Sequence, residues 1–390
     1  MDDLDAELKK YFGWESFKPG QRLVIEDVLA GKDSIAILPT GGGKSICYQL
    51  SALIRKSLVV VISPLVALME NQVQYLRSKG IPAICLHSGL SLSRKKEVND
   101  YFSGIKRDLR LLYLSPERLT KDSVRKYLTK KVVGGEIVAI AVDEAHCISS
   151  WGHDFRPDYR RLREIRSLYP SVPLLALSAT APPNVRADII KLLGLRSPSL
   201  HIFSARRQNL FYSIQRRSKD PLPKVIEEIN NSRGACLIYV RTRRLVDVWT
   251  NNLRNEGIPA ISYHAGLDHS VREHALNDFI NQSQPVLVAT VAFGMGVDRG
   301  DVGLVLHLHL PPNPERYLQE AGRAGRDGSP ARCVVLFSPS DRIKLSWAIN
   351  SAIKNDYEDV NERTLRDNLA LEKVKKMEAL AEGAQCIEKS

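Results

Sequence analysis

The 390-residue sequence predicts an α/β protein with two tandem parallel-sheet lobes and a short helical C-terminal tail. Three observations predict this fold class. Short apolar runs recur, they are continuously rich in Val, Ile and Leu rather than alternating, and segments with helical spacing separate them. The runs span residues 34–39, 58–63, 83–87, 109–115, 137–142, 174–178, 235–240, 260–264, 285–290, 304–308 and 333–337.

The two predicted lobes meet within residues 196–220, which contain several prolines and basic pairs such as Arg206–Arg207. We therefore assign residues 1–200 to lobe 1, residues 201–340 to lobe 2 and residues 341–390 to the tail. The tail is polar, and its best helix candidate is LALEKVKKMEALAE. We find no exact internal repeat in the sequence.

The amino-acid composition indicates which class of molecule the protein binds and in which cellular compartment it acts. Lys and Arg total 56 against 44 acidic residues, a net charge of +12, which favours a polyanion such as nucleic acid over a neutral partner. A solvated basic surface is the alternative on charge alone. No apolar run approaches the roughly 20 residues of a membrane span. The six cysteines form no CxxC pair, and runs such as ACLIYV and RCVVLF predict buried thiols. We expect a cytoplasmic protein, associated with the nucleoid if bacterial, or a nuclear one if eukaryotic.

The first candidate site is a glycine-rich loop between a predicted strand and a predicted helix, in SIAILPTGGGKSICYQLSALI. Backbone N–H groups of such a loop close around phosphate oxygens, Lys44 would reach the β- and γ-phosphates, and Ser45 would ligate Mg²⁺. Leu38 stands where the strict pattern has a glycine, and a glycine-rich turn is the alternative. The residues expected to hold ATP here are Thr40, Gly41, Gly42, Gly43, Lys44 and Ser45.

The second candidate site is the acidic pair in VAIAVDEAH, directly after a predicted buried strand. The carboxyl ends of parallel strands are where open α/β sheets place ligands. Asp143 suits a Mg²⁺ contact through water, and Glu144 is placed to polarise the attacking water, as phosphoryl transfer requires. An acidic pair at the start of a helix is the alternative.

A third candidate lies in the other lobe, in YLQEAGRAGRDG. Arg323 and Arg326 are three residues apart, so on a helix they would share one face. Arginines presented to a γ-phosphate stabilise the charge of phosphoryl transfer. An isolated surface arginine pair is the alternative.

Together TGGGKS, DEAH, SAT and GRAGRDG resemble the motif set of superfamily-two helicases, and the chain is more closely similar to the RecQ helicases. Five segments, spread over about residues 8–340, carry that closer resemblance: FGWESFKPGQ, SPLVALMENQV, YLSPERL, DEAHCISSWGHDFRPDY and ATVAFGMGVDRGDV. The resemblance implies two RecA-like lobes, ATP and Mg²⁺ as cofactors, and 3′–5′ movement on DNA. It also implies duplex unwinding in recombination and repair, with single-stranded and forked DNA as partners. We expect a monomer, and the sequence names no protein partner.

The resemblance also implies roles for individual residues of the ATP site. Gln21 would hydrogen-bond the adenine edge and Trp14 would stack on the ring, while Lys18 stands where the family more often has an arginine. The lobe 2 residues implied to complete the ATP site are Asp298, Gln319, Arg323 and Arg326.

The DNA side of the resemblance involves the aromatic-rich loop after the DEAH motif. The residues implied to contact single-stranded DNA and to couple it to hydrolysis are His146, Trp151, His153, Phe155, Arg156, Ser178 and Thr180. Bases stack on aromatic side chains without sequence preference, which suits this loop. Spacing alone favours a different interpretation, with Trp151 and Phe155 as core residues at the start of a helix.

Two departures from the family limit these expectations. RecQ proteins commonly continue into a zinc-binding module and a winged helix, whereas Cys386 here is a lone cysteine, so we expect no zinc. Gly303 stands where the family often has a basic residue, which predicts a missing DNA-phosphate contact. The alternative functions are a nucleic-acid-binding ATPase without productive unwinding and an RNA helicase.

Overall fold

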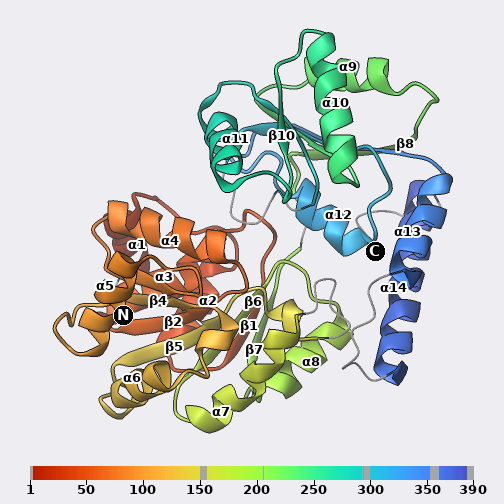
Figure 1. Cartoon of the computed structure of the whole chain (residues 1–390). Helices are drawn as coiled ribbons and strands as arrows, with labels where there is room; N and C mark the ends of the chain where they lie inside the picture. The colour runs from red at the N-terminus through yellow and green to blue at the C-terminus, as the bar shows by residue number, and fades with distance from the viewer. Residues whose placement is uncertain are drawn as a thin grey trace. The chain divides into compact units, whose positions relative to one another are not determined.

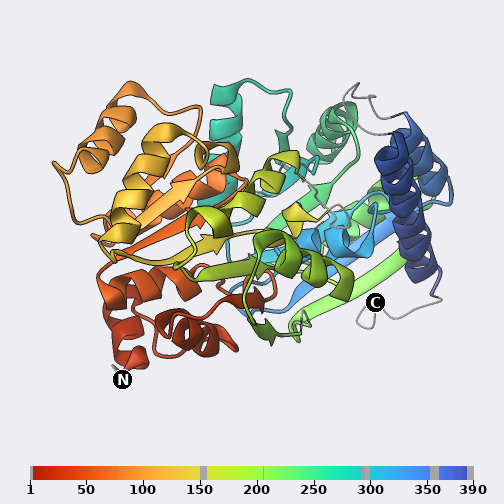
Figure 2. The same cartoon turned by 90° about the horizontal axis from the view of Figure 1, so that it is seen from below.

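The computed structural model describes residues 3–149, 156–204, 206–291, 293, 299–351 and 360–383. The chain divides into two compact units, Met1–Ala205 and Arg206–Ser390 (Figure 1). Each unit contains one parallel sheet with helices packed on it (Figure 2). The prediction of two parallel-sheet lobes is therefore confirmed.

The first unit contains a seven-stranded sheet in the order β3-β4-β2-β5-β6-β1-β7. Its strands are β1 Ser34–Ile37, β2 Leu58–Ile62, β3 Ala83–Leu86, β4 Leu111–Leu114, β5 Ile137–Val142, β6 Leu174–Ser178 and β7 Ser199–Ile202. Its α-helices are α1 Leu4–Phe12, α2 Gln21–Leu29, α3 Ile46–Arg55, α4 Val66–Ser78, α5 Leu92–Phe102, α6 Asp122–Val133, α7 Ile165–Leu168 and α8 Pro183–Leu193. Its 3₁₀ helices are η1 Pro116–Arg118, η2 Ala145–Ile148 and η3 Pro157–Glu164.

The second unit contains a six-stranded sheet in the order β10-β11-β9-β12-β13-β8. Its strands are β8 Leu210–Arg216, β9 Ala235–Tyr239, β10 Ala260–Tyr263, β11 Val286–Ala289, β12 Val302–His307 and β13 Ala331–Phe337. Its helices are α9 Leu222–Asn230, α10 Arg243–Asn255, α11 His269–Asn281, α12 Pro314–Ala321, α13 Ser340–Asn350 and α14 Val360–Ala381. This is the strand order of the first sheet without β7, so the two sheets share one topology.

The register of the first sheet aligns the ends of the strands that precede the predicted motifs. Ile37 at the end of β1 pairs with Ser178 at the end of β6. Ile62 at the end of β2 pairs with Val142 at the end of β5. All these strands are parallel, so the glycine-rich loop, the DEAH segment and the SAT segment emerge at one edge of one sheet.

Every apolar run named above overlaps a strand, although β12 and β13 begin two residues before their runs. Strands β7 and β8 come from residues 196–220, where we expected only the junction between lobes. Both are edge strands, and β7 alternates between half-buried and exposed residues instead of forming a continuous apolar run. Because β7 pairs with β1, the first unit extends beyond the expected boundary at residue 200.

The predicted tail helix is present as α14, and it packs into the second unit. Met377 and Leu380 are buried in the same apolar core as Tyr317 and Phe337. The predicted burial of Cys236 and Cys333 is also confirmed. Within the residues that the structure describes, no helix combines the length and the apolar character that crossing a membrane requires.

Candidate functional site

The glycine-rich loop joins β1 to α3, as the sequence predicts. Gly41 and Gly43 adopt φ values of 78° and 70°, in the left-handed region that favours glycine. A Cβ at Gly42 would lie 2.8 Å from the carbonyl oxygen of Pro39. The loop therefore requires glycine for its backbone shape, and Lys44 and Ser45 follow it directly at the start of α3.

Gln21 and Lys18 lie against this loop, although they are distant from it in the sequence. The buried Gln21 amide donates to the carbonyl oxygens of Gly42 and Gly43 at 3.0 and 3.1 Å, and its Oε1 accepts the backbone N–H of Lys18 at 2.9 Å. Lys18 Nζ donates to the carbonyl oxygen of Gly41 at 2.8 Å. Trp14 is 42% exposed and packs its ring beside Phe12. The structure thus places Lys18 and Gln21 against the glycine-rich loop. The partly exposed ring of Trp14 lies a few residues before them in the sequence.

The DEAH segment begins where β5 ends. The backbone N–H of Asp143 donates to the carbonyl oxygen of Ile62 at 2.8 Å, and the Tyr159 hydroxyl donates to the carbonyl oxygen of Asp143 at 2.8 Å. Glu144 adopts φ 48°, a left-handed conformation that costs a non-glycine residue about 1–3 kcal/mol. Such a conformation persists only where the surrounding structure imposes it, so tertiary contacts fix the backbone at Glu144.

The electrostatics of this site fit a cation beside Asp143. Burial and the neighbouring charge of Glu144 raise the pKa of Asp143 to about 7, and only the positive charge of Lys44 and a hydrogen bond from the Glu144 N–H oppose the rise. Within the described part of the chain, Glu144 Oε2 is buried and makes no hydrogen bond. Two crowded carboxyl groups with an unsatisfied oxygen form the kind of oxygen-rich environment that Mg²⁺ prefers.

Replacing Asp143 with asparagine should stabilise the nucleotide-free protein at alkaline pH. Between about pH 4 and pH 7 the folded carboxyl keeps a proton that the unfolded one has released, so Asp143 lowers stability as pH rises through this window. Asparagine removes that penalty. We expect the Tm to rise by about 2–8 °C at pH 8 and by less at pH 5, measured by thermal unfolding. An equal shift at both pH values would contradict the raised pKa.

A chain of contacts joins the DEAH segment to the SAT segment. His146 Nδ1 lies 2.9 Å from Ser178 Oγ, within hydrogen-bond range, and 3.4 Å from Glu144 Oε2. Ser178 Oγ in turn donates to the carbonyl oxygen of Thr180 at 2.8 Å. A displacement of Glu144 could therefore be transmitted to Thr180 through the side chains of His146 and Ser178.

The structure tests the predicted DNA-contacting residues only in part. Trp151, His153 and Phe155 lie outside the described residues. Arg156 is described, and its guanidinium donates to the carbonyl oxygen of Pro64 at 3.1 Å, in the segment that follows β2. The end of the aromatic-rich loop is thus connected to the SPLVALMENQV segment.

In the second unit, the prediction that Arg323 and Arg326 share a helical face is wrong. Helix α12 ends at Ala321, and both arginines lie in the turn that follows it. The backbone N–H of Gly325 donates to the carbonyl oxygen of Val302, which pulls the chain away from the helix axis. Gln319 lies on α12 itself, whereas Asp298 is outside the described residues.

Two residues that the sequence analysis did not assign hold this arginine turn, residues 322–327. Arg207 donates to the carbonyl oxygens of Gly322, Ala324 and Gly325. Asn209 donates to those of Gly325 and Ser329, both at 2.8 Å. The only sequence signal was the basic pair Arg206–Arg207, because the partners lie more than a hundred residues away.

Replacing Arg207 with alanine should loosen the arginine turn. Its three carbonyl partners would lose a charged donor, so we expect the second unit to lose about 2–4 kcal/mol of stability. The midpoint of denaturant unfolding measures this loss. Arg244, an exposed arginine of α10 in the same unit, is the control, and its replacement with alanine should change stability by less than about 0.5 kcal/mol. Equal effects of the two variants would contradict the role of Arg207.

Gly303 has a packing role that the sequence analysis did not anticipate. A Cβ at this position would lie 1.7 Å from the carbonyl oxygen of Arg233, so the strand has no room for a side chain here. The register between β12 and β9 shifts at the same place, between Val302 and Leu304. The glycine is thus explained by close backbone packing in the sheet.

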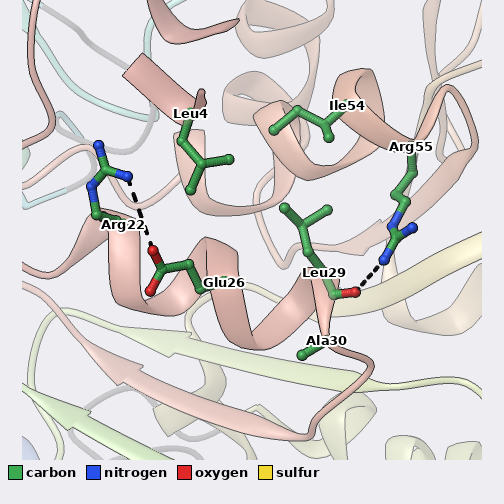
Figure 3. A pocket seen from close by; sticks show the side chains of 7 residues that line it. All are labelled: Leu4, Arg22, Glu26, Leu29, Ala30, Ile54 and Arg55. Carbon is green, nitrogen blue, oxygen red and sulfur yellow. Dashed lines mark hydrogen bonds and ion pairs between the residues drawn. The ribbon is translucent and has the colours of Figure 1, made fainter. Parts of the chain in front are cut away.

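One pocket of the first unit is separate from all these residues. It has a volume of about 350 Å³ and lies beside α1, α2 and the end of α3 (Figure 3). Its two arginines are already engaged: Arg22 with Asp5 and Glu26, and Arg55 with the carbonyl oxygen of Leu29. The pocket offers no polar group that calls for a ligand, and we assign none.

Comparison with known proteins decides the family. Residues 18–188 match the family model described as DEAD/DEAH box helicase, and residues 220–328 match the Helicase conserved C-terminal domain. The chain is 40% identical over 349 residues to the Probable ATP-dependent DNA helicase RecS of Bacillus subtilis, covering 87% of the chain and 68% of that protein. The chain belongs to the RecQ helicase family. It is also 42% identical to the ATP-dependent DNA helicase RecQ of Pasteurella multocida over 86% of its own length and 52% of that relative.

The RecQ chain thus spans about half the length of the Pasteurella relative and of the Haemophilus influenzae RecQ, of which it covers 53%. Solved structures support the fold alone. Mycobacterium smegmatis helicase Lhr, bound to ssDNA and AMP-PNP, has a TM-score of 0.68 at 19% identity, covering 88% of this chain and 49% of that one. A DEAD-box helicase bound to ssRNA and UDP-BeF has a TM-score of 0.68 at 18% identity, covering 95% and 81%. The prediction of RecA-like helicase lobes is confirmed.

Proposed function

We propose that this chain is the motor of an ATP-dependent DNA helicase, which moves 3′–5′ along a single strand and separates duplexes in recombination and repair. The observation that carries the proposal is the shared sheet edge where the glycine-rich loop, the strained Glu144 and the His146–Ser178 contact meet. The net charge of +12 supports a polyanionic track. Chromosomal DNA in the nucleoid or the nucleus would be its place of action.

In the proposed mechanism the first unit binds and orients ATP. The loop residues Thr40–Gly43 cradle the phosphates, and Lys44 contacts the β- and γ-phosphates. Gln21 forms hydrogen bonds with the adenine edge. To do so, its side-chain amide must give up its hydrogen bonds to the carbonyl oxygens of Gly42 and Gly43. Trp14 stacks on the ring. Nucleotide binding would therefore replace the contacts that Gln21 makes to the carbonyl oxygens of the loop.

Hydrolysis depends on the two carboxyl groups after β5. Asp143 and Ser45 would hold the Mg²⁺ that accompanies ATP, and the cation supplies charge neutralisation at the phosphates. Glu144 orients the attacking water and accepts its proton. We propose that Asp298, Gln319, Arg323 and Arg326 of the second unit complete the site by stabilising the charge on the transferred phosphoryl group.

Coupling to DNA would begin in the aromatic-rich loop. Trp151, His153, Phe155 and Arg156 contact the single strand, and the His146–Ser178–Thr180 contacts transmit its presence to Glu144. ATP turnover with and without a single-stranded oligonucleotide tests this proposal. Strong stimulation by DNA and displacement of a strand from a 3′-tailed duplex, but not from a 5′-tailed one, are expected. Stimulation without displacement would favour a binding ATPase, and stronger stimulation by RNA would favour an RNA helicase.

Binding to the single strand should weaken steeply with salt. Neutralising a phosphate releases condensed counterions, so the logarithm of affinity falls with the logarithm of salt at a slope of about −0.7 per phosphate contacted. Fluorescence anisotropy of a labelled oligonucleotide between low and physiological salt measures the slope. A flat response would contradict a groove that follows the DNA backbone.

A further inference from the structure

The two units contain an internal repeat that the sequence analysis did not find. It covers residues 66–90, VALMENQVQYLRSKGIPAICLHSGL, and residues 243–267, RRLVDVWTNNLRNEGIPAISYHAGL, without a gap. The two segments share the strings LR and GIPAI and the pattern HxGL. In the structure they are α4 followed by β3 and α10 followed by β10, which occupy the same position in the two sheets.

The two copies of the repeat share side-chain contacts as well as residue identities. Arg77 Nε donates to the carbonyl oxygen of Ala83 at 2.8 Å, and Arg254 Nε donates to that of Ala260 at 2.9 Å. Each arginine fastens the end of its helix to the start of the strand that follows. This part of the repeat explains the shared fold and needs no further function.

A second preserved contact lies at the opposite end of each strand. The backbone N–H of Gly89 donates to His87 Nδ1 at 3.2 Å, and that of Gly266 donates to His264 Nδ1 at 3.2 Å. Because Nδ1 accepts in both, the proton of a neutral ring is on Nε2. His87 Nε2 lies 3.2 Å from Glu70 Oε1, and His264 Nε2 lies 3.4 Å from Asp247 Oδ1.

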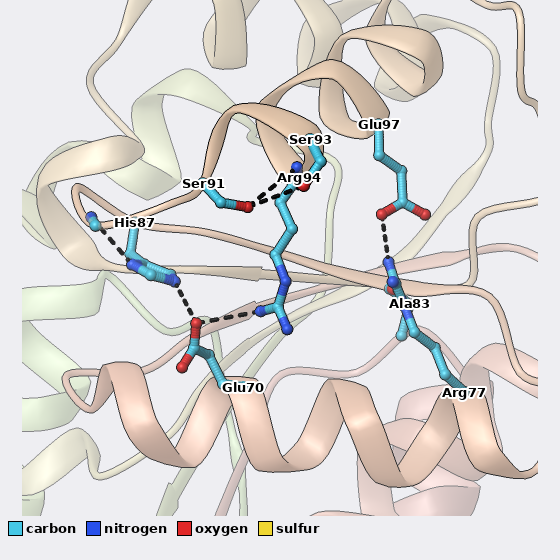
Figure 4. Close-up of polar contacts among 9 residues, drawn as sticks. Glu70, Arg77, Ala83, His87, Ser91, Ser93, Arg94 and Glu97 are labelled. Carbon is cyan, nitrogen blue, oxygen red and sulfur yellow. Dashed lines mark hydrogen bonds and ion pairs between the residues drawn. The ribbon is translucent and has the colours of Figure 1, made fainter. Parts of the chain in front are cut away.

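Each histidine therefore accepts the N–H of its loop glycine and lies beside a carboxylate of the preceding helix, although His87 Nε2 makes no hydrogen bond to the described residues. Figure 4 shows Glu70 on α4 between His87 and Arg94, whose Nη1 is 3.1 Å from the same Glu70 oxygen. Both histidines are almost fully buried. We call each arrangement of carboxylate, histidine and glycine N–H a clamp: Glu70–His87–Gly89 and Asp247–His264–Gly266.

The clamp of the first unit is not explained as a metal site. Glu70, Cys85 and His87 do bring three ligand atoms within 4.8 Å of one another. A metal on Nε2 would move the ring proton to Nδ1, where it would face the Gly89 N–H, and Arg94 already occupies Glu70. In the second unit the counterpart of Cys85 is Ser262, so the clamp is repeated but the potential metal ligands are not.

The position of the clamps indicates what they serve. Both loops, residues 87–91 and 264–268, emerge at the carboxyl ends of parallel strands, the edge where such sheets bind ligands. The nucleotide loop is not repeated, because β8, the counterpart of β1, is followed by RSKDP instead of glycines. The glycine-rich loop occurs in one unit only, as expected for binding a single ATP. The clamp occurs in both units, as expected for binding a polymer whose backbone repeats the same chemical group.

The local chemistry fits a chain of phosphates. Ser88 and Gly89 in one loop, and Ala265 and Gly266 in the other, are small enough for a ligand backbone to approach closely. Basic side chains accompany both: Arg94, which pairs with Glu70, lies in the first turn of α5, and Arg243 would be 3.0 Å from a Cβ at Gly266. Nucleic-acid backbones are bound by such combinations of main-chain and basic groups.

We infer that His87 and His264 are positioning residues of two matched clamps, each of which holds a loop in the shape that contacts the phosphodiester backbone of a single strand. The inference rests on the proposed function, since it presumes that the chain binds single-stranded DNA. The histidines act through the loops and do not themselves contact the strand.

The two ring nitrogens can be tested separately with the full chain and a labelled single-stranded oligonucleotide, by anisotropy without nucleotide. Alanine at His87 or His264 should weaken binding about fivefold each, the cost of one lost hydrogen bond, and the double variant about 25-fold. His87→Asn and His264→Asn keep an acceptor for the glycine N–H and should restore binding to within about twofold. His87→Gln and His264→Gln place an N–H towards the carboxylate but offer no acceptor to the glycine N–H. These glutamine variants should therefore bind the oligonucleotide as weakly as the alanine variants.

His201→Ala is the matched control, because His201 also contacts a carboxylate, Asp27 at 2.7 Å, but lies within β7 instead of in either loop. It should lower the Tm without changing DNA affinity. Alanine variants that lose stability but bind DNA like the wild type would overturn the inference, as would equal weakening by His201→Ala. A wild-type chain that binds no oligonucleotide would instead refute the proposed function itself.

Discussion

Replacing Arg323 with alanine should lower DNA-stimulated ATP turnover by about 10³-fold or more, the cost of removing an arginine that stabilises a transferring phosphoryl group. The side chain is well placed for this role within its own unit. Its Nε is buried and makes no hydrogen bond to any described residue, and its charge acts on Tyr239, whose pKa burial raises to about 12. Among the residues that the structure describes, no ion pair with a carboxylate is found for this guanidinium.

Steady-state turnover with saturating DNA, together with binding of a fluorescent ATP analogue, measures this effect. Turnover should fall while the affinity for the analogue changes little, since the arginine acts on the transition state. Arg342→Ala is the control, because Arg342 forms an exposed ion pair with Glu378 at 3.0 Å and should leave turnover unchanged. Full activity of the Arg323 variant would show that the arginine turn does not reach the nucleotide.

Replacing Glu144 with glutamine should lower ATP turnover by about 10²–10⁴-fold, the usual contribution of a positioned general base. The amide keeps the size of the side chain but cannot accept a proton from water. ATP binding should persist, so single-turnover hydrolysis separates the chemical step from binding. Glu164→Gln removes an exposed carboxylate that pairs with Arg125, and it should be silent.

The same variant has a second expected consequence that does not involve hydrolysis. The charge of Glu144 helps to raise the pKa of Asp143, so its removal should lower that pKa. The loss of stability between acidic and alkaline pH should then become smaller than in the wild type. A Glu144 variant with full turnover would contradict the proposed role, even if its stability followed this pattern.

The sequence predicted the parts of the fold and the site that depend on neighbouring residues. The strands that precede the glycine-rich loop and DEAH are buried on both faces, so each produced a continuous apolar run followed directly by its motif. The edge strands β7 and β8 were missed because a half-exposed strand has no such run. The strained backbone of Glu144 was also missed, because tertiary contacts impose it against local preference.

The arginine turn shows the limit of spacing arguments. Two arginines three residues apart would share a helical face only if the helix continued, and here Gly325 leaves it with a φ of 51°. The contacts that fix the turn come from Arg207 and Asn209, far away in the sequence. The internal repeat was overlooked for a related reason: its identities are concentrated in short strings between positions that have diverged.

Arg207 is the second residue of the second unit, directly after the division of the chain at Ala205. Its guanidinium nevertheless donates to the carbonyl oxygens of Gly322, Ala324 and Gly325, on both sides of the proposed catalytic arginine. A displacement of Arg207 would therefore reach the turn around Arg323 through a single side chain. The residues just after the division of the chain therefore also determine the shape of the turn that contains the proposed catalytic arginine.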